Sequence, residues 1–392
     1  MSGAATNDRG TRPLRVLHFV SGGFSGATQV AIDLCNPDPT TQTLLVLRRK
    51  RQTSAHRIAE LRRRGIAVET VPAWPHLLTV VRLAQWCRAW RADVLVAHGF
   101  SEHLWGRWAG LLAGVPHWVQ VEHNVRERYG RWRLWQSRWL ARRTDAIVAV
   151  SDSVRRSLIE RGHPAARCVV IPNGIDLERW PCGQPWEARE PAVIMAARFA
   201  RQKDPLTLIR AADRLRQRGT PMHIYLAGGG SVRWRARAER EIDALDLRAW
   251  VHVLGPVDDL PQRYRHVRYC VLSTHYEGLP LALVEGMASG CCPLGSDVEG
   301  VRDVITPGHN GCLFPAGDAD ALADLLQTLE REPARAARLA LAAAADARAR
   351  FDRALMRQRY AALLHRIARH GSVDVDITAS DRALASSLQP PP

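Results

Sequence analysis

The chain has 392 residues, with 55 Lys and Arg against 39 Asp and Glu, and a formal net charge of +16 at pH 7. Its composition, 46% hydrophobic and 24% charged, is that of a globular protein long enough for two domains. No run approaches the ~18 apolar residues that cross a bilayer, and residues 1–12 lack the apolar segment of a signal peptide. We therefore expect a cytoplasmic protein without a transmembrane helix. The eight cysteines show no zinc-site spacing, which favours reduced, buried thiols.

Short apolar runs alternate with helix-length segments through the first half of the chain. The first run, residues 14–20, ends in Ser21-Gly22-Gly23 and precedes a helical pattern. Because alternation of this kind is typical of a parallel sheet covered on both faces, residues 13–182 are predicted to form one Rossmann-like domain after a flexible N-terminus, residues 1–12. The later strand candidates are residues 43–47, 68–71, 94–97, 118–121 and 146–150.

The same alternation restarts after residues 180–185, a linker rich in helix-breaking residues. It predicts a second α/β domain over residues 183–351. The Ala-rich segment from Asp320 to about His370 is predicted to be helical, with a break near residues 350–352, and residues 371–392 favour a disordered tail. The strand candidates of the second domain are residues 192–196, 223–227, 251–254, 269–272 and 291–294.

Two carboxylates, Glu277 and Glu285, lie eight positions apart in residues 274–290. Gly278 and Pro280 indicate a turn, and apolar residues at helical spacing follow, so Glu277 is expected in a loop and Glu285 in the first turns of a helix. Backbone N–H groups at a helix start attract phosphate, and carboxylates accept hydrogen bonds from the vicinal hydroxyls of sugars. The alternative is that Glu285 is only a favourable acidic residue near a helix N-terminus.

This segment resembles the Glu-x7-Glu signature of GT-B glycosyltransferases of the family 4 type, also called glycosyl transferases group 1. Arg198 and Lys203 resemble the Arg…Lys pair of that family. The run Asn-Gly-Ile-Asp at residues 173–176 resembles its Asn-Gly-hydrophobic-Asp motif, and Gly22-Gly23 resembles its N-terminal glycine loop. The resemblance covers roughly residues 13–368, and the ordered series is more specific than any one member.

The resemblance implies a GT-B fold, in which two Rossmann-like domains with parallel sheets face a central cleft. Residues 13–182 would be the acceptor domain and residues 183–351 the nucleotide-sugar donor domain, with a helix at about 352–370 packing back on the first. The sequence departs from the family in two places. Gly286 replaces the usual Ala after the second Glu, and Cys291-Cys292-Pro293-Leu294 is an unusual version of the following strand.

By this resemblance, Glu285 would bind the ribose of the donor and Glu277 would hold hydroxyls of the transferred sugar. Arg198 and Lys203 would neutralise the diphosphate as it leaves. The family retains the anomeric configuration, and we expect front-face attack in which the donor diphosphate helps to deprotonate the acceptor hydroxyl. The remaining donor-binding candidates are Gly22, Gly23, Gly228, Gly278, Leu279 and Pro280. Gly228 is also explained by conformation alone, since glycines close many strand-to-helix turns.

Three residues are candidates on the acceptor side: His98, Glu102 and His123. His123 follows a predicted strand and resembles the family histidine near the transferred sugar, so it is also a candidate catalytic residue. A lone histidine at a strand end is, however, also commonly structural. The implied acceptor is a glycolipid or oligosaccharide, as in the assembly of lipopolysaccharide, O-antigen or capsule, and the implied activity is that of a hexosyltransferase.

No metal or cofactor is expected, because the nucleotide sugar is itself a substrate. Asp318-Ala319-Asp320 matches the Asp-x-Asp pattern that GT-A enzymes use for a divalent ion, but it begins the Ala-rich helix and is better explained as a cap. Asp374-Val375-Asp376 falls in the predicted tail. The expected activity is therefore independent of metal.

The positive charge is concentrated in residues 1–180, which hold 27 Arg and Lys against 14 Asp and Glu. This favours an anionic partner such as a membrane surface, a phosphorylated glycolipid or a nucleic acid, unless it reflects an Arg-rich composition alone. Residues 126–143 place Trp132, Trp135 and Trp139 among seven arginines. Such a helix either lies on anionic lipid or turns its Trp stripe to the core, and we favour the second. The first would give a peripheral location on the cytoplasmic face of the inner membrane.

Two other functions compete with glycosyl transfer. A sugar-nucleotide epimerase of similar shape does not carry the series Arg198, Lys203, Glu277 and Glu285 in this form. A nucleic-acid-binding protein would suit the sequence pI of about 10.4. However, no zinc finger or RNP signature occurs and the second half is nearly neutral, so no nucleic-acid partner is expected.

Overall fold

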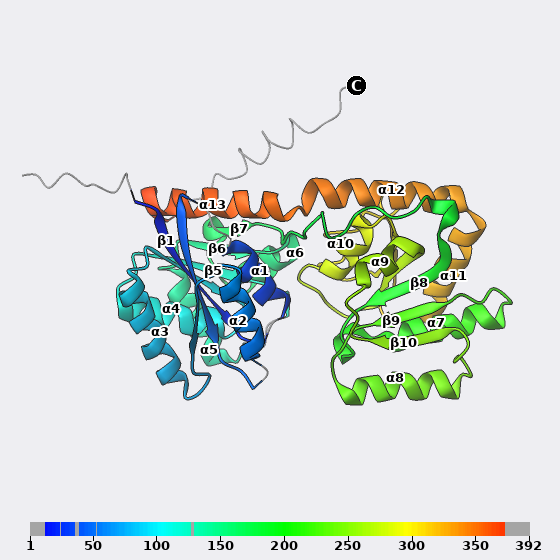
Figure 1. The fold of residues 1–392 in the computed structure, drawn as a ribbon, viewed down its shortest axis with the longest axis horizontal. Coiled ribbons are helices and arrows are strands. Elements are labelled where there is room, and N and C mark those ends of the chain that lie inside the picture. Colours follow the sequence, from blue (N-terminus) through cyan, green and yellow to red (C-terminus); the bar gives the residue numbers. More distant parts are fainter. Residues whose placement is uncertain (1–11, 24, 36–38, 52, 127–128, 373–392) are drawn as a thin grey trace, which may run out of the picture. The chain divides into compact units, whose positions relative to one another are not determined.

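The computed structural model describes residues 12–23, 25–35, 39–51, 53–126 and 129–372 (Figure 1). These residues form two compact units. The first contains the chain up to Val150, residues 154–171 and the residues from Arg357 onward, and the second contains residues 151–153 and 172–356. Each unit is built on one parallel sheet, which confirms the predicted α/β fold class of two Rossmann-like domains.

The sheet of the first unit has the strand order β3-β2-β1-β4-β5-β6-β7. All six apolar runs predicted in this half form strands, because strands buried on both faces contain nearly continuous apolar residues. β7 was not predicted, since its three residues are too few to give a pattern. The strands are β1 (Leu14–Ser21), β2 (Thr41–Arg48), β3 (Val68–Val71), β4 (Val94–His98), β5 (His117–Glu122), β6 (Ala146–Ala149) and β7 (Cys168–Val170).

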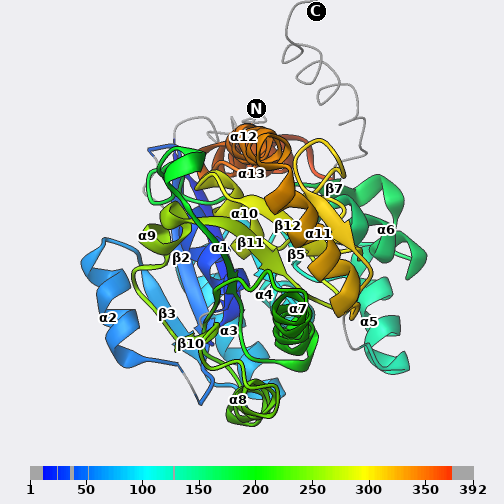
Figure 2. The same ribbon diagram turned by 90° about the vertical axis from the view of Figure 1, so that its right-hand side faces the viewer.

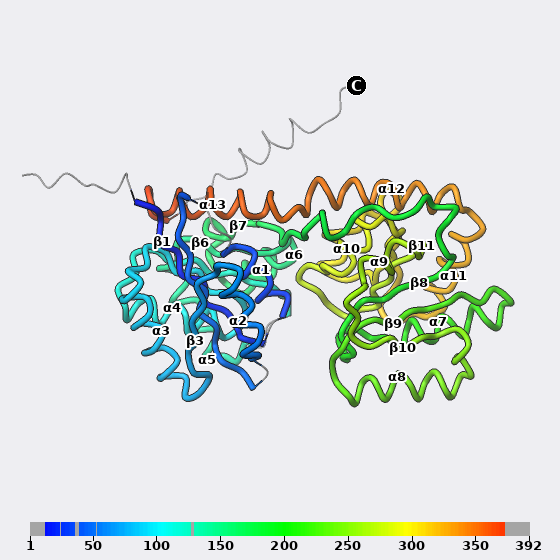
Figure 3. The backbone as a smooth tube through the Cα atoms, in the orientation of Figure 1, coloured from blue at the N-terminus to red at the C-terminus, as the bar shows by residue number. Residues whose placement is uncertain are grey.

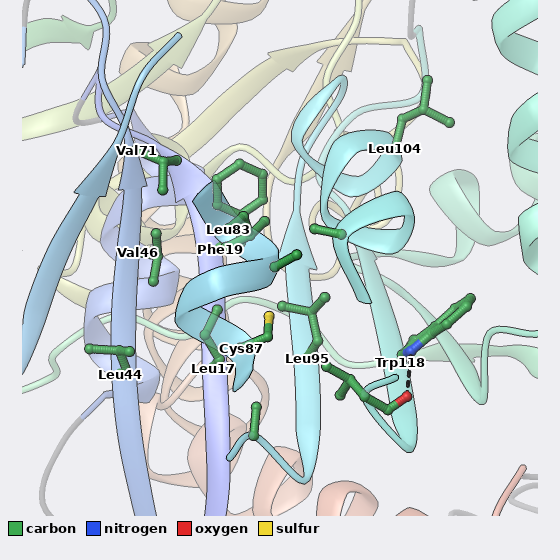
Figure 4. Packing of buried hydrophobic residues seen from close by; sticks show 14 of the residues in the cluster. Leu17, Phe19, Leu44, Val46, Val71, Leu83, Cys87, Leu95, Leu104 and Trp118 are labelled. Atoms are coloured by element: carbon green, nitrogen blue, oxygen red, sulfur yellow. Dashed lines mark hydrogen bonds between the residues drawn. The ribbon is translucent and has the colours of Figure 1, made fainter. Parts of the chain in front are cut away.

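Helices cover both faces of this sheet. Successive residues along a strand point to opposite faces of the sheet. Leu17 and Phe19 pack under α3 and α4, in the core drawn in Figure 4, whereas Val20 packs under α1 and α2 on the other face. The Trp118 indole donates a hydrogen bond to the Val115 carbonyl at the lower edge of this core. The helices are α1 (Gly26–Leu34), α2 (Ala55–Arg63), α3 (His76–Trp90), α4 (Glu102–Ala113), α5 (Arg131–Ala141), α6 (Asp152–Glu160) and the 3-10 turn η1 (Ala165–Arg167).

The sheet of the second unit has the order β10-β9-β8-β11-β12-β13. Its five predicted strands are present, and the three-residue β13 was missed for the same reason as β7. In Figure 2, α11 lies beside α7, and the pairs Arg214–Asp320 and Arg218–Asp324 join these two helices. The strands are β8 (Glu190–Ala196), β9 (Ile224–Ala227), β10 (Val251–Gly255), β11 (Val267–Leu272), β12 (Cys292–Ser296) and β13 (Cys312–Phe314). The helices are α7 (Pro205–Gln217), α8 (Val232–Ala244), α9 (Leu260–His266), α10 (Leu281–Ala288), α11 (Ala319–Arg331) and α12 (Pro333–Arg350), with 3-10 turns η2 (Trp186–Ala188) and η3 (Arg201–Lys203).

The helix that precedes the undescribed C-terminal residues, in orange to red in Figure 3, belongs to both units. α13 (Arg353–His370) begins in the second unit and, from Arg357, is part of the first, where the Arg357 guanidinium donates to the Asp33 carbonyl at 2.6 Å. The helical segment breaks at Phe351, as predicted, and also at Glu332. The predicted disordered tail lies almost entirely outside the described residues.

The motif at residues 173–176 lies at this crossing and packs with the second unit, although the sequence analysis placed it in the first domain. The Ile175 amide donates to the Phe351 carbonyl at 2.8 Å, and the Arg353 amide donates to the Ile175 carbonyl at 2.9 Å. A Cβ on Gly174 would lie 2.5 Å from the Cα of Arg353, so only glycine fits there. The Asn-Gly-Ile-Asp motif therefore anchors the returning chain.

Candidate active site

Glu277 and Lys203 meet at the carboxyl ends of two adjacent strands of the second unit, β11 and β8. The Glu277 side chain is buried, and its Oε1 pairs with the Lys203 ammonium and accepts a hydrogen bond from the Thr274 hydroxyl at 2.9 Å. Loops beyond the carboxyl ends of parallel strands are where such folds bind ligands. The two sequence candidates are thus brought together.

The loops that carry these residues are fastened to each other. The Gln202 side-chain amide donates to the Tyr276 carbonyl at 2.7 Å, and the Gln202 carbonyl accepts from both the Thr274 hydroxyl and the His275 amide at 2.9 Å. The Ser273 hydroxyl donates to the Asp204 carbonyl at 2.8 Å. Lys203 and Glu277 are therefore held by a double set of hydrogen bonds, which gives a preorganised site.

Gly300 supports the Glu277 loop from the other side and was not predicted. Its backbone has φ +80, and a Cβ there would lie 2.5 Å from the Glu277 carbonyl oxygen. Both the conformation and the close approach require glycine. The sequence offered no signal for this role, because the contact joins loops 23 residues apart whose proximity depends on the fold.

Arg198 is exposed, in the loop that follows β8. The structure places the glycines at residues 228–230 directly against that loop. A Cβ on Gly228 would lie 2.1 Å from the Ala197 carbonyl oxygen, and the Phe199 amide donates to the Gly229 carbonyl at 2.7 Å. Gly228 therefore shapes the backbone on which Arg198 is carried. Among the described residues the Arg198 guanidinium has no hydrogen-bond or ion-pair partner, so its charge is available.

Glu285 lies in the second turn of α10, as the sequence predicted, and is half-buried. Burial raises its pKa to about 8, and the nearby Arg179 lowers it only in part. Gly278, Leu279 and Pro280 form the buried turn that leads from Glu277 into this helix. Burial disfavours the charged form of this carboxyl group, and a ligand that donates hydrogen bonds to it would stabilise that form.

The departure at Gly286 has a packing reason. A Cβ there would lie 2.6 Å from the Cys270 Sγ, 2.7 Å from the Cys270 Cβ and 3.0 Å from the Tyr264 ring. The larger residues at positions 270 and 264 thus occupy the space that an alanine would need. Cys291 and Cys292 are also buried, as predicted, and of the eight cysteines, all of them within the described residues, only Cys182 is exposed.

In the first unit, the glycine loop follows β1. The Gly22 amide donates to the Arg48 carbonyl at 2.9 Å, and a Cβ on Gly22 would lie 2.5 Å from the Thr53 hydroxyl. Gly23, the next residue, is half-buried. Thr28 is fully buried and donates its hydroxyl to the Ser21 carbonyl at 2.8 Å, so it fixes the loop to the start of α1.

Glu102 is engaged in a buried ion-pair network and not exposed to solvent. Its Oε1 lies 3.2 Å from the Arg48 guanidinium and 3.4 Å from the Lys50 ammonium, and its Oε2 accepts from the Ser101 hydroxyl at 2.9 Å. Because removing one partner of such a pair leaves a buried charge, this carboxylate has a structural role whether or not it meets an acceptor.

His98 and His123 lie side by side, with ring centroids 5.8 Å apart and planes inclined by 23°. His98 Nε2 lies 3.0 Å from Nδ1 of a third histidine, His18, which the sequence analysis missed. Burial lowers the pKa of His18 to about 3 and that of His123 to about 4, and lowers that of His98 well below its usual value. All three rings are neutral at physiological pH.

Family models match both halves of the chain. "Glycosyltransferase Family 4" matches residues 41–179, and "Glycosyl transferases group 1" matches residues 178–346. This chain is a GT-B glycosyltransferase of the family 4 type, also called glycosyl transferases group 1. Its first departure from the family, Gly286, lies within the second of the two matched regions.

The glycosyltransferase has relatives and structural neighbours of several activities. It is 28% identical over 283 residues to an α-maltose-1-phosphate synthase of Mycolicibacterium smegmatis, covering 62% of this chain and 71% of the relative. It is 27% identical over 233 residues to the amylovoran biosynthesis glycosyltransferase AmsK of Erwinia amylovora, covering 57% of each chain. The structure of Anabaena Alr3699/HepE in complex with UDP has a TM-score of 0.80 at 22% identity, covering 90% of this chain and 99% of that one. At that identity, the structural likeness shows the fold.

The Trp-rich segment of the glycosyltransferase forms α5, and its three tryptophans differ. Trp139 packs on the core and stacks on Trp108 at 5.5 Å between ring centroids. Trp132 and Trp135 are 67% and 54% exposed and stack on each other at 4.8 Å. The prediction that the stripe faces the core is therefore right for Trp139 and wrong for the other two. Their exposure reflects a helix whose N-terminal half extends beyond the core.

Among the residues described in this glycosyltransferase, no group of three or more His, Cys, Asp or Glu side chains could hold a metal ion. Asp318 caps α11, as predicted, by accepting the Ala321 amide at 2.9 Å. Asp374 and Asp376 lie outside the described residues. Within the same described ranges, no helix is both long and apolar enough to cross a membrane.

Proposed function

We propose that this glycosyltransferase transfers a sugar from a nucleotide-sugar donor to a glycolipid or polysaccharide acceptor, with retention of the anomeric configuration. The observation that carries the proposal is the group formed by the paired Lys203 and Glu277, the unpartnered Arg198 and the carboxyl of Glu285 in one unit. HepE of Anabaena, which shares the fold, was crystallised with UDP and with UDP-glucose. The acceptor class is supported by AmsK, an amylovoran biosynthesis enzyme, and by the lipopolysaccharide galactosyltransferase WaaB, whose structure has a TM-score of 0.70.

The donor is bound through complementary groups. The Glu285 carboxylate accepts hydrogen bonds from the ribose diol, and Glu277 accepts hydrogen bonds from hydroxyls of the transferred sugar. Arg198 and Lys203 face the diphosphate, where negative charge grows as the glycosidic bond to phosphate breaks. The backbone at Gly278 to Pro280 contacts the phosphates, and Gly22 and Gly23 are further candidate donor contacts. Lys203 thus has two anionic partners, Glu277 at all times and the diphosphate during turnover.

The reaction proceeds by front-face attack. A glycosyl–enzyme intermediate would need a carboxylate at bonding distance on the face opposite the leaving group. Glu277 is instead held by Lys203 and Thr274, which reduces its nucleophilicity. The sugar therefore passes through an oxocarbenium-like state, and a phosphate oxygen of the departing diphosphate takes the proton of the acceptor hydroxyl.

Activity is independent of a divalent metal. The two cations Arg198 and Lys203 supply the positive charge that stabilises a leaving diphosphate. Activity should persist after treatment with EDTA and dialysis. Loss of activity that manganese restores would contradict this part of the proposal.

The enzyme acts at the cytoplasmic face of a membrane, where glycolipid acceptors are accessible. Two apolar groups support this: Trp74 and Leu77 at the start of α3, 75% and 74% exposed, and Trp132 and Trp135 at the start of α5. Both helices follow strands of the same parallel sheet, so their first turns lie at the same edge of the unit (Figure 1). Trp side chains prefer membrane interfaces, and the arginines of α5 complement anionic headgroups.

Co-sedimentation with vesicles tests this surface. The wild-type protein should bind vesicles of phosphatidylcholine with phosphatidylglycerol, and the double variants Trp74→Ser/Leu77→Ser and Trp132→Ser/Trp135→Ser should bind several-fold less. Leu112→Ser is the control. Leu112 is also exposed, but it lies near the C-terminus of α4, whereas the tested residues lie near the N-termini of α3 and α5. Equal binding by all four proteins would refute the membrane surface.

A thermal-shift screen against UDP-, GDP-, ADP- and CMP-sugars tests the activity itself. The correct donor should raise the melting temperature, because a ligand that binds only the folded state stabilises it by mass action. NMR of the product then gives its anomeric configuration. Inversion would refute the retaining mechanism, and no shift with any of the nucleotide sugars would refute the donor class.

A further inference from the structure

Three histidines lie in a row in the first unit, and two of them share one face of its sheet. In the register of the sheet, His18 of β1 pairs with Val96 of β4, and His98 pairs with Val121 of β5. Paired residues of parallel strands point to the same face, as do residues two apart along a strand. His18 and His98 therefore point to the same face, and His98 lies two residues nearer the carboxyl edge. His123 follows the last residue of β5, and its ring stacks beside that of His98.

His18 is the deepest member of the row and is joined to His98 by a hydrogen bond. Both side chains are 1% exposed, and His18 Nδ1 lies 3.0 Å from His98 Nε2. The other ring nitrogen of His98, Nδ1, is buried and has no hydrogen-bond partner among the described residues. The same is true of both ring nitrogens of His123. Three buried nitrogens are thus unsatisfied at the edge where ligands bind, and buried polar atoms of that kind normally have partners.

The hydrogen bond links the tautomer of His98 to that of His18. Each neutral imidazole carries one proton, so one of the two facing nitrogens donates and the other accepts. If His98 Nε2 is the donor, His98 Nδ1 has a lone pair and accepts a hydrogen bond. If His18 Nδ1 is the donor, the proton of His98 lies on Nδ1, which then becomes a donor. Only the first arrangement lets His98 accept the O–H proton of a sugar hydroxyl in a hydrogen bond.

We propose that His18 is a positioning residue that holds His98 as the Nε2-protonated tautomer, so that His98 Nδ1 accepts a hydrogen bond from a sugar hydroxyl of the acceptor. This inference rests on the proposed glycosyl transfer for its substrate, but the tautomer is a property of the protein alone. The three histidines stay uncharged throughout the reaction. His98 orients the acceptor sugar through a hydroxyl that does not react. The attacking hydroxyl is a different one, and its proton goes to the leaving diphosphate.

NMR of protein labelled with 15N in histidine tests the tautomer directly. The His98 signals, assigned by their loss in His98→Phe, should show a protonated Nε2 and an unprotonated Nδ1 without change from pH 5 to 8. In His18→Leu the two tautomers should mix, because the partner of Nε2 is lost. In His18→Asn a side-chain amide atom replaces Nδ1, and its oxygen can restore the single tautomer. A His98 ring protonated at Nδ1 in the wild-type protein would overturn the proposal.

Kinetics provide an independent test. His18→Leu should lower kcat/KM for the acceptor up to about tenfold, the effect of one hydrogen bond, and leave KM for the donor unchanged. His18→Asn should recover most of the loss. The double variant His18→Leu/His98→Phe should be no worse than His98→Phe, because His18 acts only through His98. Additive losses would overturn the proposal.

A matched control separates positioning from packing. Val16→Ala removes a buried side chain from the same strand and face, two residues before His18, without touching His98. It should lower the melting temperature and leave both the tautomer and the acceptor kinetics unchanged. If wild-type protein transfers no sugar, the proposed function fails, and the NMR result still decides the role of His18.

Discussion

The Lys203 ammonium is paired with the Glu277 carboxylate in a site whose other cation, Arg198, has no partner among the described residues. The two cations are therefore not equivalent. Lys203 is held by an anion, whereas Arg198 is exposed. In the proposed donor complex Arg198 would gain its first anionic partner, and the site would be nearly neutral around the sugar and positive around the phosphates.

The two glutamates should differ in what their loss changes. Glu285→Ala should weaken binding of the nucleotide about 10- to 100-fold, because hydrogen bonds to a charged group are lost. Glu277→Ala should lower kcat about 100-fold or more and change nucleotide affinity little. Isothermal titration and initial rates measure the two effects. Glu299→Ala, an exposed carboxylate of the same unit, is the control. Equal losses in both assays for both variants would disprove the division of roles.

Donor affinity should depend on pH through Glu285. Its pKa of about 8 means that the carboxylate form, which accepts hydrogen bonds from the ribose, becomes tenfold rarer for each pH unit below 8. Affinity for the nucleotide sugar identified by thermal shift should rise about tenfold per unit from pH 6 to 8 and then level off. In Glu285→Gln the affinity should be flat over the same range. A flat wild-type profile would show that the carboxyl group does not contact the donor.

The same group should make stability depend on pH in the absence of ligand. The pKa of Glu285 is about 8 in the folded protein against an ordinary value of 4.5, so between these values the folded state holds a proton that the unfolded state releases. Its contribution is therefore complete below pH 4.5 and is lost as pH rises to 8. Glu285→Gln should match the wild type in melting temperature at pH 4.5 and exceed it at pH 8. A gap that stays constant across the range would contradict the raised pKa.

Gly300→Ala should reduce both stability and transfer, although Gly300 touches no proposed substrate. The added Cβ would meet the Glu277 carbonyl at 2.5 Å and displace the loop that holds Glu277. Gly308→Ala is a close match, since Gly308 has φ +79 and a Cβ there meets nothing within 4 Å. Both variants pay about 1 kcal/mol for the left-handed backbone. The difference between the two variants in melting temperature and kcat measures the effect of the contact between the new Cβ and the Glu277 carbonyl. No difference would mean that the loop moves to accommodate the Cβ without loss.

Gly286→Ala, which restores the usual family residue, should destabilise this protein by about 1–3 kcal/mol through overpacking. Cys270→Ala removes the sulfur that lies 2.6 Å from the new Cβ, so the double variant should lose less than the sum of the two single variants. Chemical denaturation measures each loss. Gly26→Ala serves as the control, because it is helical and its Cβ would meet no atom within 4 Å. If the stability losses of the two single variants simply add in the double variant, Cys270 does not occupy the space that the new methyl group at position 286 needs.

Much of this fold was predictable because its strands are buried on both faces and contain nearly continuous apolar residues. β7 and β13 were not, since three residues give no pattern. The site was predictable where chemistry is carried by neighbours in sequence, as at Glu277 and Glu285. It was not predictable where it depends on register: the His18–His98 hydrogen bond joins residues 80 apart, and the Arg48–Glu102 pair joins residues 54 apart. Only the sheet order brings them together.

The discontinuous first unit has a consequence for synthesis of the chain. Its sheet is complete at β7, but the Asp33 carbonyl and the Thr41 hydroxyl meet Arg357 and His365 only when α13 has left the ribosome. The second unit also waits for Phe351 and Arg353 to join residues 173–176. During translation each unit therefore exists as a nearly finished intermediate, and the short stretch 351–365 completes both.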